Sequence, residues 1–291
     1  MTLVGQVIEL HRYPVKSMLG ERVETSDVTD RGLAGDRGYA LMDSETGKIV
    51  SAKRPRLWGK MFTLHAALSS PPSLGSPASV QVTLPDGQTV STTDPAFDQK
   101  MSDTLGRKVS LVSTTDDFLT YEEVWVDEKQ ADPYGPVVGT EGDDRLIENP
   151  VSVGGPRGTF FDYSAIHLLT ASTLRALRAA YAEGAFDVRR FRPNIVIDAD
   201  GENFAENAWL ERVLRIGESA KVEVLVPTPR CVMTTLPQDD LPKDSGILRT
   251  AAQANRLPFG PFGEQACVGV YADVVAGGSI GIGDPVYLEP A

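Results

Sequence analysis

The amino-acid sequence predicts a mainly β protein of the α+β class with a few short helices. Three observations support this fold class. The chain has 291 residues, which is enough for two domains or one large one. Short apolar runs separated by turn residues dominate it, whereas helical periodicity is confined to a few segments. Hydrophobic residues make up 41% of the chain, which provides enough material for packed cores.

Strands are predicted where short runs of β-favouring residues lie between turn signals. Pro85-Asp86-Gly87 follows one such run and indicates a hairpin turn. A second hairpin is predicted at Gly277-Gly278, where Val274–Val275 would turn back into Ile280–Ile282, followed by Pro285–Leu288. The clearest strand-like runs are Val4–Leu10, Tyr39–Met42, Val80–Leu84, Lys108–Val112, Asn194–Ile197, Val222–Val226 and Val268–Val275.

The best helix signal follows Asp94, a good N-cap residue, and ends at Gly106, which provides a C-terminal stop. Its apolar side chains recur at every fourth position, which predicts one buried face. These side chains are Phe97, Met101 and Leu105.

Two further helices are predicted in the second half of the chain. One starts near Thr170 or Ser172 and stops at Gly184. A weaker one surrounds Phe204–Leu210.

The charge balance excludes several classes of function. The chain has 28 Lys and Arg against 40 Asp and Glu, a formal net charge of −12. Such a charge argues against a nucleic-acid binder, and it disfavours anionic membrane surfaces. The N-terminus lacks the pattern of a signal peptide, and no apolar stretch is long enough for a membrane span. The expectation is therefore a cytoplasmic protein.

The negative charge is concentrated in one segment. Residues 116–148 contain 11 acidic residues and only Lys129 and Arg145 as bases. Such a segment is typical of a solvated loop or insertion, and the alternative is a docking face for a basic partner. The break between two domains is expected in this region.

The chain has few residues of the types that bind metals. Its two cysteines, Cys231 and Cys267, exclude four-thiolate zinc and iron–sulfur sites. The histidines His11, His65 and His167 are too scattered to form a spaced motif. The run from Gly277 to Gly281 matches GxSxG, but it lacks the following helix and histidine of a hydrolase.

Cys231 is the candidate reactive residue. It follows a predicted strand on a turn stiffened by prolines, directly after Arg230. A neighbouring guanidinium favours the thiolate, which is both a nucleophile and a soft-metal ligand. The alternative is an inert buried cysteine, which is the interpretation for Cys267 in its alternating apolar run.

Basic residues gather in three short islands despite the acidic composition. One contains Arg189, Arg190 and Arg192 just before a predicted strand. Guanidinium groups suit phosphate and other planar anions, so the islands predict an anionic ligand if they meet in space. A solvated strand entrance is the alternative for the arginine island. The other islands are the turn with Arg230 beside Cys231, and a third that covers Lys16-Ser17, Arg37 and Lys53-Arg54.

Several motifs resemble a known family. Tyr13-Pro14-Val15-Lys16-Ser17 and Gly32-Leu33-Ala34-Gly35-Asp36-Arg37 resemble the N-terminal β-barrel domain that precedes MOSC domains (molybdenum cofactor sulfurase C-terminal). Phe191-Arg192-Pro193-Asn194-Ile195, Arg230-Cys231 with Thr234-Thr235, and the closing Gly283-Asp284-Pro285-Val286-Tyr287-Leu288 resemble the MOSC domain itself. The resemblance implies an N-terminal β-barrel domain over residues 1–118 and a MOSC β-barrel domain over residues 119–291. The functional group it resembles is the amidoxime-reducing component and its bacterial relatives.

This resemblance implies a molybdenum–molybdopterin cofactor with Cys231 as the protein ligand to molybdenum and as the catalytic residue. The implied reaction is a two-electron, two-proton reduction of a small N-hydroxylated substrate, with oxygen leaving as water while molybdenum cycles between +4 and +6. The protein would orient the cofactor and neutralise its charge. The positions that would hold the pterin and its phosphate are Lys16, Ser17, Arg37, Ser164, Arg192, Asn194 and Arg230.

Two departures from the family bear on partners. The sequence has no fused ferredoxin domain and no spare cysteines, so electrons are expected from a separate protein of the ferredoxin, flavin reductase or cytochrome type. The pyridoxal-phosphate desulfurase of the sulfurase enzymes is absent as well. One alternative function is a carrier of the cofactor or of a Cys-bound sulfur, and another is a small-molecule binding barrel in which Cys231 is inert.

Overall fold

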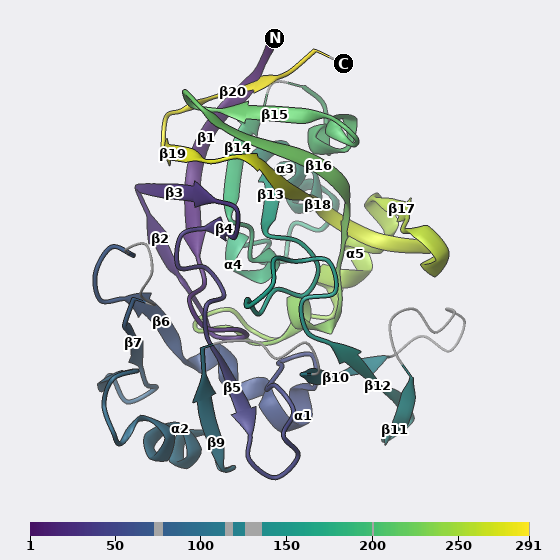
Figure 1. The fold of residues 1–291 in the computed structure, drawn as a ribbon. Coiled ribbons are helices and arrows are strands. Elements are labelled where there is room, and N and C mark those ends of the chain that lie inside the picture. The colour runs from purple at the N-terminus through teal and green to yellow at the C-terminus, as the bar shows by residue number, and fades with distance from the viewer. Residues whose placement is uncertain (73–77, 114–118, 126–135, 200, 291) are drawn as a thin grey trace. The chain divides into compact units, whose positions relative to one another are not determined.

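The computed structural model describes residues 1–72, 78–113, 119–125, 136–199 and 201–290 (Figure 1). In these residues the chain forms twenty strands and five short α-helices, so the mainly β prediction is confirmed. The chain divides into two compact units. The barrel unit comprises Met1–His11, Arg22–Ala34 and Tyr163–Ala291, and the second unit comprises Arg12–Glu21 and Gly35–Asp162. Each unit is built from segments that alternate along the chain. The predicted domains, residues 1–118 and 119–291, are consecutive stretches of sequence, and the boundary between them stays a prediction.

Seven strands of the barrel unit close on themselves (Figure 1). The closing pair is β13 with β18, and closure leaves these strands without free edges. Only β13 and β14 run parallel; the other neighbours are antiparallel. In spatial order the strands are β13 (Ile166–Thr170), β14 (Ile195–Ala199), β1 (Thr2–Arg12), β20 (Pro285–Leu288), β15 (Val213–Ile216), β16 (Ala220–Pro229) and β18 (Glu264–Ala276). Two short strands extend the sheet, β2 (Glu21–Val23) beside β1 and β17 (Arg256–Pro258) beside β18.

Three helices pack on this unit. The predicted helix near Thr170 is confirmed as α3 (Ala171–Ala180), and the Thr170 side chain caps it by accepting from the Thr173 N–H. It ends before Gly184, with Tyr181 at its C-cap. α4 (Val188–Phe191) and α5 (Gly246–Ala254) were not predicted. The apolar faces meet in one core cluster that includes Leu174, Leu177, Phe186, Phe191, Ile247 and Val268.

The predicted hairpin at Gly277-Gly278 is wrong. β19 (Gly278–Gly281) pairs with β3 (Thr25–Thr29), which pairs in turn with β4 (Gly32–Leu33). The glycines permit this close approach, because a Cβ at Gly277 would lie 2.8 Å from the Val28 carbonyl oxygen. No hydrolase elbow is present either, since this run lies in and beside a strand.

The predicted helix around Phe204–Leu210 is a short 3₁₀ helix, Ala205–Trp209. It supplies Glu206, whose carboxylate is fully buried in the barrel unit. Thr173 Oγ1 lies 2.7 Å from Glu206 Oε1, and Thr170 Oγ1 donates to the same carboxylate. The segment therefore supports the start of α3.

The second unit contains three small sheets and two helices. The predicted hairpin turn is confirmed, with the Leu84 N–H donating to the Gln88 carbonyl at 2.8 Å and Gly87 at φ 84°. The helix predicted from Asp94 begins later, at Phe97, because the Asp94 carboxylate first binds the Ala96 N–H at 2.8 Å in a turn. The sheets are β5 (Ala40–Asp43) with β9 (Val109–Val112); β6 (His65–Leu68), β7 (Val80–Thr83) and β8 (Thr89–Ser91); and β10 (Thr120–Trp125), β12 (Asp144–Pro150) and β11 (Val137–Glu141). The helices are α1 (Pro55–Trp58) and α2 (Phe97–Leu105).

Candidate functional site

Cys231 lies where a barrel strand turns into a short 3₁₀ helix. β16 ends at Pro229, and the Arg230 N–H still pairs with the Ala266 carbonyl of β18 at 2.8 Å. The chain then leaves the sheet, and the Thr234 N–H and hydroxyl bind the Cys231 carbonyl at 3.2 and 3.0 Å. Cys231 is half-buried and forms no disulfide. A thiol at this corner is held by backbone on both sides.

Cys267 has a different environment. It is fully buried on β18, and its sulfur lies 3.4 Å from the Gln265 carbonyl oxygen. Burial raises the pKa of Cys267 to about 12, with the Arg230 guanidinium opposing the shift. Its thiol therefore stays protonated at neutral pH, and the prediction that Cys267 belongs to the core is confirmed.

The three arginines of the island before β14 have different environments. Arg189 lies at the surface and pairs with Asp187 and Asp240 at 2.9 and 2.7 Å. Arg190 is completely buried. Arg192 is 8% exposed and adopts the left-handed conformation at the C-cap of α4, with φ 55°. The island is therefore an ordered corner of the barrel unit, and the alternative of a solvated strand entrance fits only Arg189.

Arg230 connects the Cys231 corner to α4. Its Nη2 donates to the Phe191 carbonyl at 2.8 Å, and its guanidinium lies 5.8 Å from the centre of the Phe191 ring. Its Nε is buried, and no acceptor for it occurs in the described part of the chain. A bound anionic group beside Cys231 would supply such an acceptor.

Asn194 and Ser164, which the family resemblance also indicates, are both buried among strands. Asn194 accepts from the His167 N–H at 3.1 Å and donates to the His11 carbonyl at 3.3 Å, so it joins β13, β14 and β1. The Ser164 hydroxyl lies 2.6 Å from the Ala272 carbonyl oxygen and 2.7 Å from Asp273 Oδ1. Both side chains support the barrel, and their part in cofactor binding stays a prediction.

The second unit brings its two predicted motifs together. The Arg37 N–H donates to the Tyr13 carbonyl and the Lys16 N–H to the Tyr39 carbonyl, both at 2.9 Å. Ser17 and Arg37 adopt positive φ angles of 64° and 45°, which non-glycine residues rarely do. The Ser17 hydroxyl accepts from the Ala52 N–H at 3.1 Å. These two motifs therefore form one ordered loop pair.

Lys16 is the buried centre of a charge cluster in the second unit. Its Nζ donates to the Phe160 carbonyl at 2.9 Å and to the Asp162 carboxylate. Lys53 Nζ lies 3.4 Å from Asp162 Oδ2 and 3.2 Å from Glu123 Oε2. Burial lowers the pKa of Lys16, and Asp162 opposes that shift. Although burial acts against it, the two lysines hold the pKa of Asp162 well below its usual range.

Arg37, which the resemblance places with the cofactor residues, is also ion-paired. Its guanidinium binds Asp36 and lies 4.4 Å from the centre of the Tyr13 ring. Asp162 was missed as a partner of Lys16, because it lies 146 positions away and no motif contains it, whereas Asp36 lies inside the motif next to Arg37.

The described part of the acidic segment is substantially neutralised within the second unit. Lys48 binds Glu122 and Glu148 at 2.7 Å each, and Arg54 Nε binds Glu141 at 2.7 Å. These ion pairs weaken the interpretation of a docking face for a basic partner. Residues 116–118 and 126–135 of the segment lie outside the described residues.

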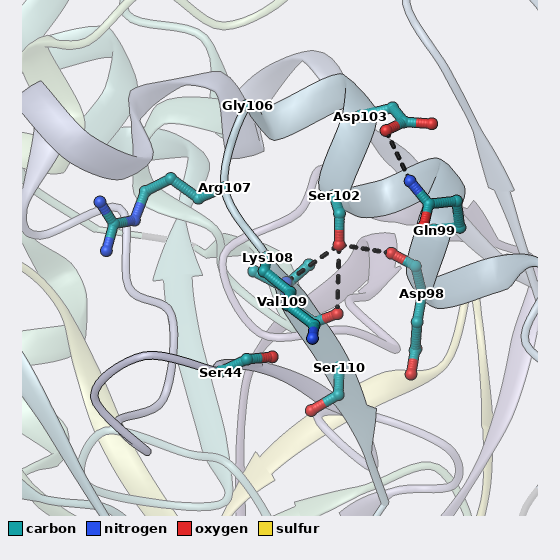
Figure 2. A pocket seen from close by; sticks show the side chains of 10 residues that line it. All are labelled: Ser44, Asp98, Gln99, Ser102, Asp103, Gly106, Arg107, Lys108, Val109 and Ser110. Carbon is teal, nitrogen blue, oxygen red and sulfur yellow. Dashed lines mark hydrogen bonds between the residues drawn. The ribbon is translucent and has the colours of Figure 1, made fainter.

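A surface hollow of about 610 Å³ occurs beside α2 and β9 in the second unit, and Figure 2 shows its lining. It contains none of the predicted site residues. Its polar groups bind one another: Ser102 Oγ accepts from the Val109 N–H at 3.0 Å, and Gln99 donates to Asp103 at 2.8 Å (Figure 2). The hollow is therefore not the candidate site.

The described residues constrain the chemistry further. They contain no group of three or more His, Cys, Asp or Glu side chains able to hold a metal ion. None of their helices is long and apolar enough to cross a membrane.

Comparisons with known proteins agree with the motifs. The chain matches the MOSC N-terminal β-barrel domain model over residues 4–125 and the MOSC domain model over residues 155–287. This chain is therefore a MOSC-domain protein with the MOSC N-terminal β-barrel domain, which confirms the family resemblance.

The relatives it matches include mitochondrial amidoxime reducing component 2 from Rattus norvegicus. The two are 27% identical over 299 residues, which cover 98% of this chain and 83% of the relative. The protein of the same name from Bos taurus is 24% identical over 297 residues, with the same coverage. Among solved structures, YiiM from Geobacillus stearothermophilus is 22% identical with a TM-score of 0.31, over 54% of this chain and 72% of that chain.

The barrel unit fits the molybdenum–molybdopterin cofactor that the family resemblance implies. A thiolate such as that of Cys231 is a soft metal ligand. Arg230, the residue before Cys231, has a buried Nε without an acceptor in the described residues, and guanidinium groups suit an anionic pterin phosphate. The available donors therefore match a cofactor that combines a thiophilic metal with a negatively charged organic part.

Proposed function

We propose that this protein is a molybdenum-dependent oxidoreductase that reduces small N-hydroxylated compounds such as amidoximes or hydroxylamines. The observation that carries the proposal is the half-buried Cys231 just after the end of β16, preceded by Arg230, whose buried Nε has no acceptor in the described residues. Membership of the MOSC family and similarity to amidoxime reducing components over 98% of the chain support it.

The residues of the barrel unit have distinct parts in this proposal. Cys231 is the protein ligand to molybdenum, and Arg230 and Arg192 offset negative charge on the pterin. When bound, the cofactor would supply the two electrons with which an N–OH group and two protons become N–H and water. The Thr234 contacts to the Cys231 carbonyl hold the backbone that carries the thiol.

The remaining predicted cofactor residues are Lys16, Ser17 and Arg37 in the second unit, with Ser164 and Asn194 in the barrel unit. Lys16 and Arg37 are already paired with Asp162 and Asp36. We infer that these pairs pre-orient the cations, and that each cation keeps donor capacity for a cofactor oxygen.

The reaction needs an electron donor, for which we propose a separate protein of the ferredoxin, flavin reductase or cytochrome type. The substrate is a small molecule. The relatives carry the word mitochondrial in their names. For this chain we retain a cytoplasmic location as a prediction, to be tested by fractionation of the native host.

The test is to purify the protein from a host that makes the cofactor and to compare wild type with Cys231→Ala. We expect about one molybdenum per wild-type chain, with benzamidoxime reduction driven by reduced methyl viologen, and loss of both in Cys231→Ala. Cys267→Ala is the matched control and should keep its molybdenum, since that thiol is buried in the core.

Equal activity in wild type and Cys231→Ala would overturn the proposal. Stoichiometric persulfide on Cys231 without molybdenum would instead favour the alternative of a carrier for the cofactor or for Cys-bound sulfur. Native mass spectrometry of the same preparation distinguishes these outcomes.

A further inference from the structure

Arg190 has an unusual environment for an arginine. Its side chain is completely buried, and it is among the largest fully buried side chains of the described residues. Within the described residues its guanidinium donates to four backbone carbonyls, and the carboxylates of Asp244 and Asp187 favour its charge without a hydrogen bond to it. Burial of a cation bound only by neutral carbonyls is unfavourable compared with an apolar side chain of similar volume. We therefore explain the presence of an arginine at this buried position by the backbone segments that its guanidinium holds together.

Three of the four carbonyls belong to the segment that follows Cys231. Nη1 binds the Thr234 and Leu236 carbonyls, both at 3.1 Å, and Nη2 binds the Pro242 carbonyl at 2.7 Å. The fourth bond runs from Nε to the Ala185 carbonyl at 2.8 Å, ahead of α4. One rigid, planar group thus ties α4 to the loop on the C-terminal side of Cys231.

A second bond ties the other side of Cys231 to the same helix. Arg230, the residue before Cys231, donates to the carbonyl of Phe191, the residue after Arg190. Within the loop, the Gln238 amide binds the Met233 carbonyl at 3.2 Å, and the Asp244 N–H binds the Thr235 carbonyl at 2.9 Å. Cys231 therefore lies between two attachments to α4, which hold the backbone on both sides of the thiol.

We propose that Arg190 is a positioning residue for Cys231: its buried guanidinium fixes the loop from Thr234 to Pro242 and thereby sets the place and exposure of the thiol. The value of this arrangement for metal ligation rests on the proposed function, whereas the effect on the thiol does not. A lysine would keep the charge, but it lacks the planar fork that reaches carbonyls in several directions.

The experiment measures alkylation of Cys231 by iodoacetamide in cofactor-free protein, with Cys267→Ala as the common background. Rates are compared at their high-pH limit, where the thiol is ionised in every variant, so that they report position and exposure alone. We expect Arg190→Lys and Arg190→Met to increase the limiting rate by about fivefold or more, because loss of these hydrogen bonds lets the loop open locally.

Arg189→Gln is the matched control, since Arg189 lies on the same helix but pairs with surface carboxylates. Its rate should stay within about twofold of wild type, as for other exposed ion pairs. Near-ultraviolet circular dichroism verifies that each variant is folded, and if Arg190→Met does not fold, Arg190→Lys decides the outcome. Wild-type rates in the folded Arg190 variants would overturn the proposal.

A second readout separates this inference from the proposed function. In protein from a cofactor-competent host, Arg190→Lys should lose molybdenum faster than wild type during dialysis. If Cys231→Ala keeps its molybdenum, the proposed function fails, while a changed alkylation rate in Arg190→Lys still supports the positioning role.

Discussion

Arg230 reaches back from the Cys231 corner to bind the Phe191 carbonyl at 2.8 Å, so that the residue next to the thiol is attached to the last residue of α4. The same guanidinium has a buried Nε without an acceptor in the described residues. One side chain thus combines a structural hydrogen bond with a buried donor that has no acceptor in the described residues.

Replacing Arg230 by lysine should separate these two functions. A lysine ammonium cannot donate in the two directions that the guanidinium uses. The variant should therefore lose one charge-assisted hydrogen bond to the cofactor, which is worth about 1.5–3 kcal/mol. Such a loss should lower the cofactor affinity at least about tenfold. The measurement is molybdenum content after equilibrium dialysis. Arg215→Lys is the control, because Arg215 also stacks on an aromatic ring, Tyr287 at 4.4 Å, and should retain wild-type molybdenum content.

Lys16→Met should destabilise the protein by about 2–3 kcal/mol, because it leaves the Asp162 carboxylate with only part of its positive surroundings. Adding Asp162→Asn to that variant should recover part of the loss, since no unpaired charge then remains. Urea denaturation measures both effects. Lys100→Met removes a more exposed pair with Asp94 and should change the free energy of unfolding by less than about 1 kcal/mol. A Lys16→Met variant as stable as wild type would contradict this account.

Cys267 should make the protein less stable in alkaline solution. Its pKa is raised by burial to about 12 in the folded state, above the value of about 8.5 expected for an unfolded chain. The folded state therefore retains a proton that the unfolded state loses, so the contribution of Cys267 is fully present below pH 8.5 and declines from there towards the folded pKa.

Denaturation curves between roughly pH 8 and 10.5 test whether the free energy of unfolding falls as the pH rises. This thiol should contribute a slope of at most about 1.4 kcal/mol per pH unit. Cys267→Ala should show a flatter decline than wild type, whatever its stability at neutral pH. Parallel declines in the two proteins would show that the thiol does not titrate on unfolding in this range.

Glu206 should produce a pH dependence on the acid side. Burial raises its pKa, although the hydroxyls of Thr170 and Thr173 act in the opposite direction. The pKa of Glu206 in the folded state lies above the value of about 4.3 expected for the unfolded chain. Its contribution to the free energy of unfolding is therefore fully present below about pH 4.3 and declines as the pH rises through the folded pKa. Glu206→Gln should therefore gain stability relative to wild type between pH 4 and 7, as measured by thermal unfolding. A constant difference over this range would contradict the raised pKa.

Strand positions were predictable because their signal is local. The runs Val222–Val226 and Val268–Val275 show apolar patterns and turn boundaries that identify β16 and β18 without knowledge of their partners. The pairing of β19 with β3 was not predictable, since it depends on glycines that accept a strand from the other end of the chain. α5 was missed although Ile247 and Ala251 lie four residues apart and are both buried.

The site was predictable only in part. Cys231 was identified because thiols are scarce and its arginine neighbour is adjacent in sequence. The different environments of Arg189 and Arg190 were not predictable, because both residues have the same chemistry and only the path of the loop after Cys231 decides which guanidinium is buried. Asp162 has no motif, and its pairing with Lys16 depends entirely on contacts that are remote in sequence.

The position of β1 between β14 and β20 has a consequence for synthesis of the protein. β1 pairs with β14 and β20, which both lie far later in the sequence, so the barrel cannot close until β20 has been synthesised. Until then the hydrogen-bonding edges of β1 need protection, by chaperones or by transient pairing with other segments. Slow, chaperone-sensitive maturation should accompany this topology, and cofactor loading at Cys231 would follow ring closure.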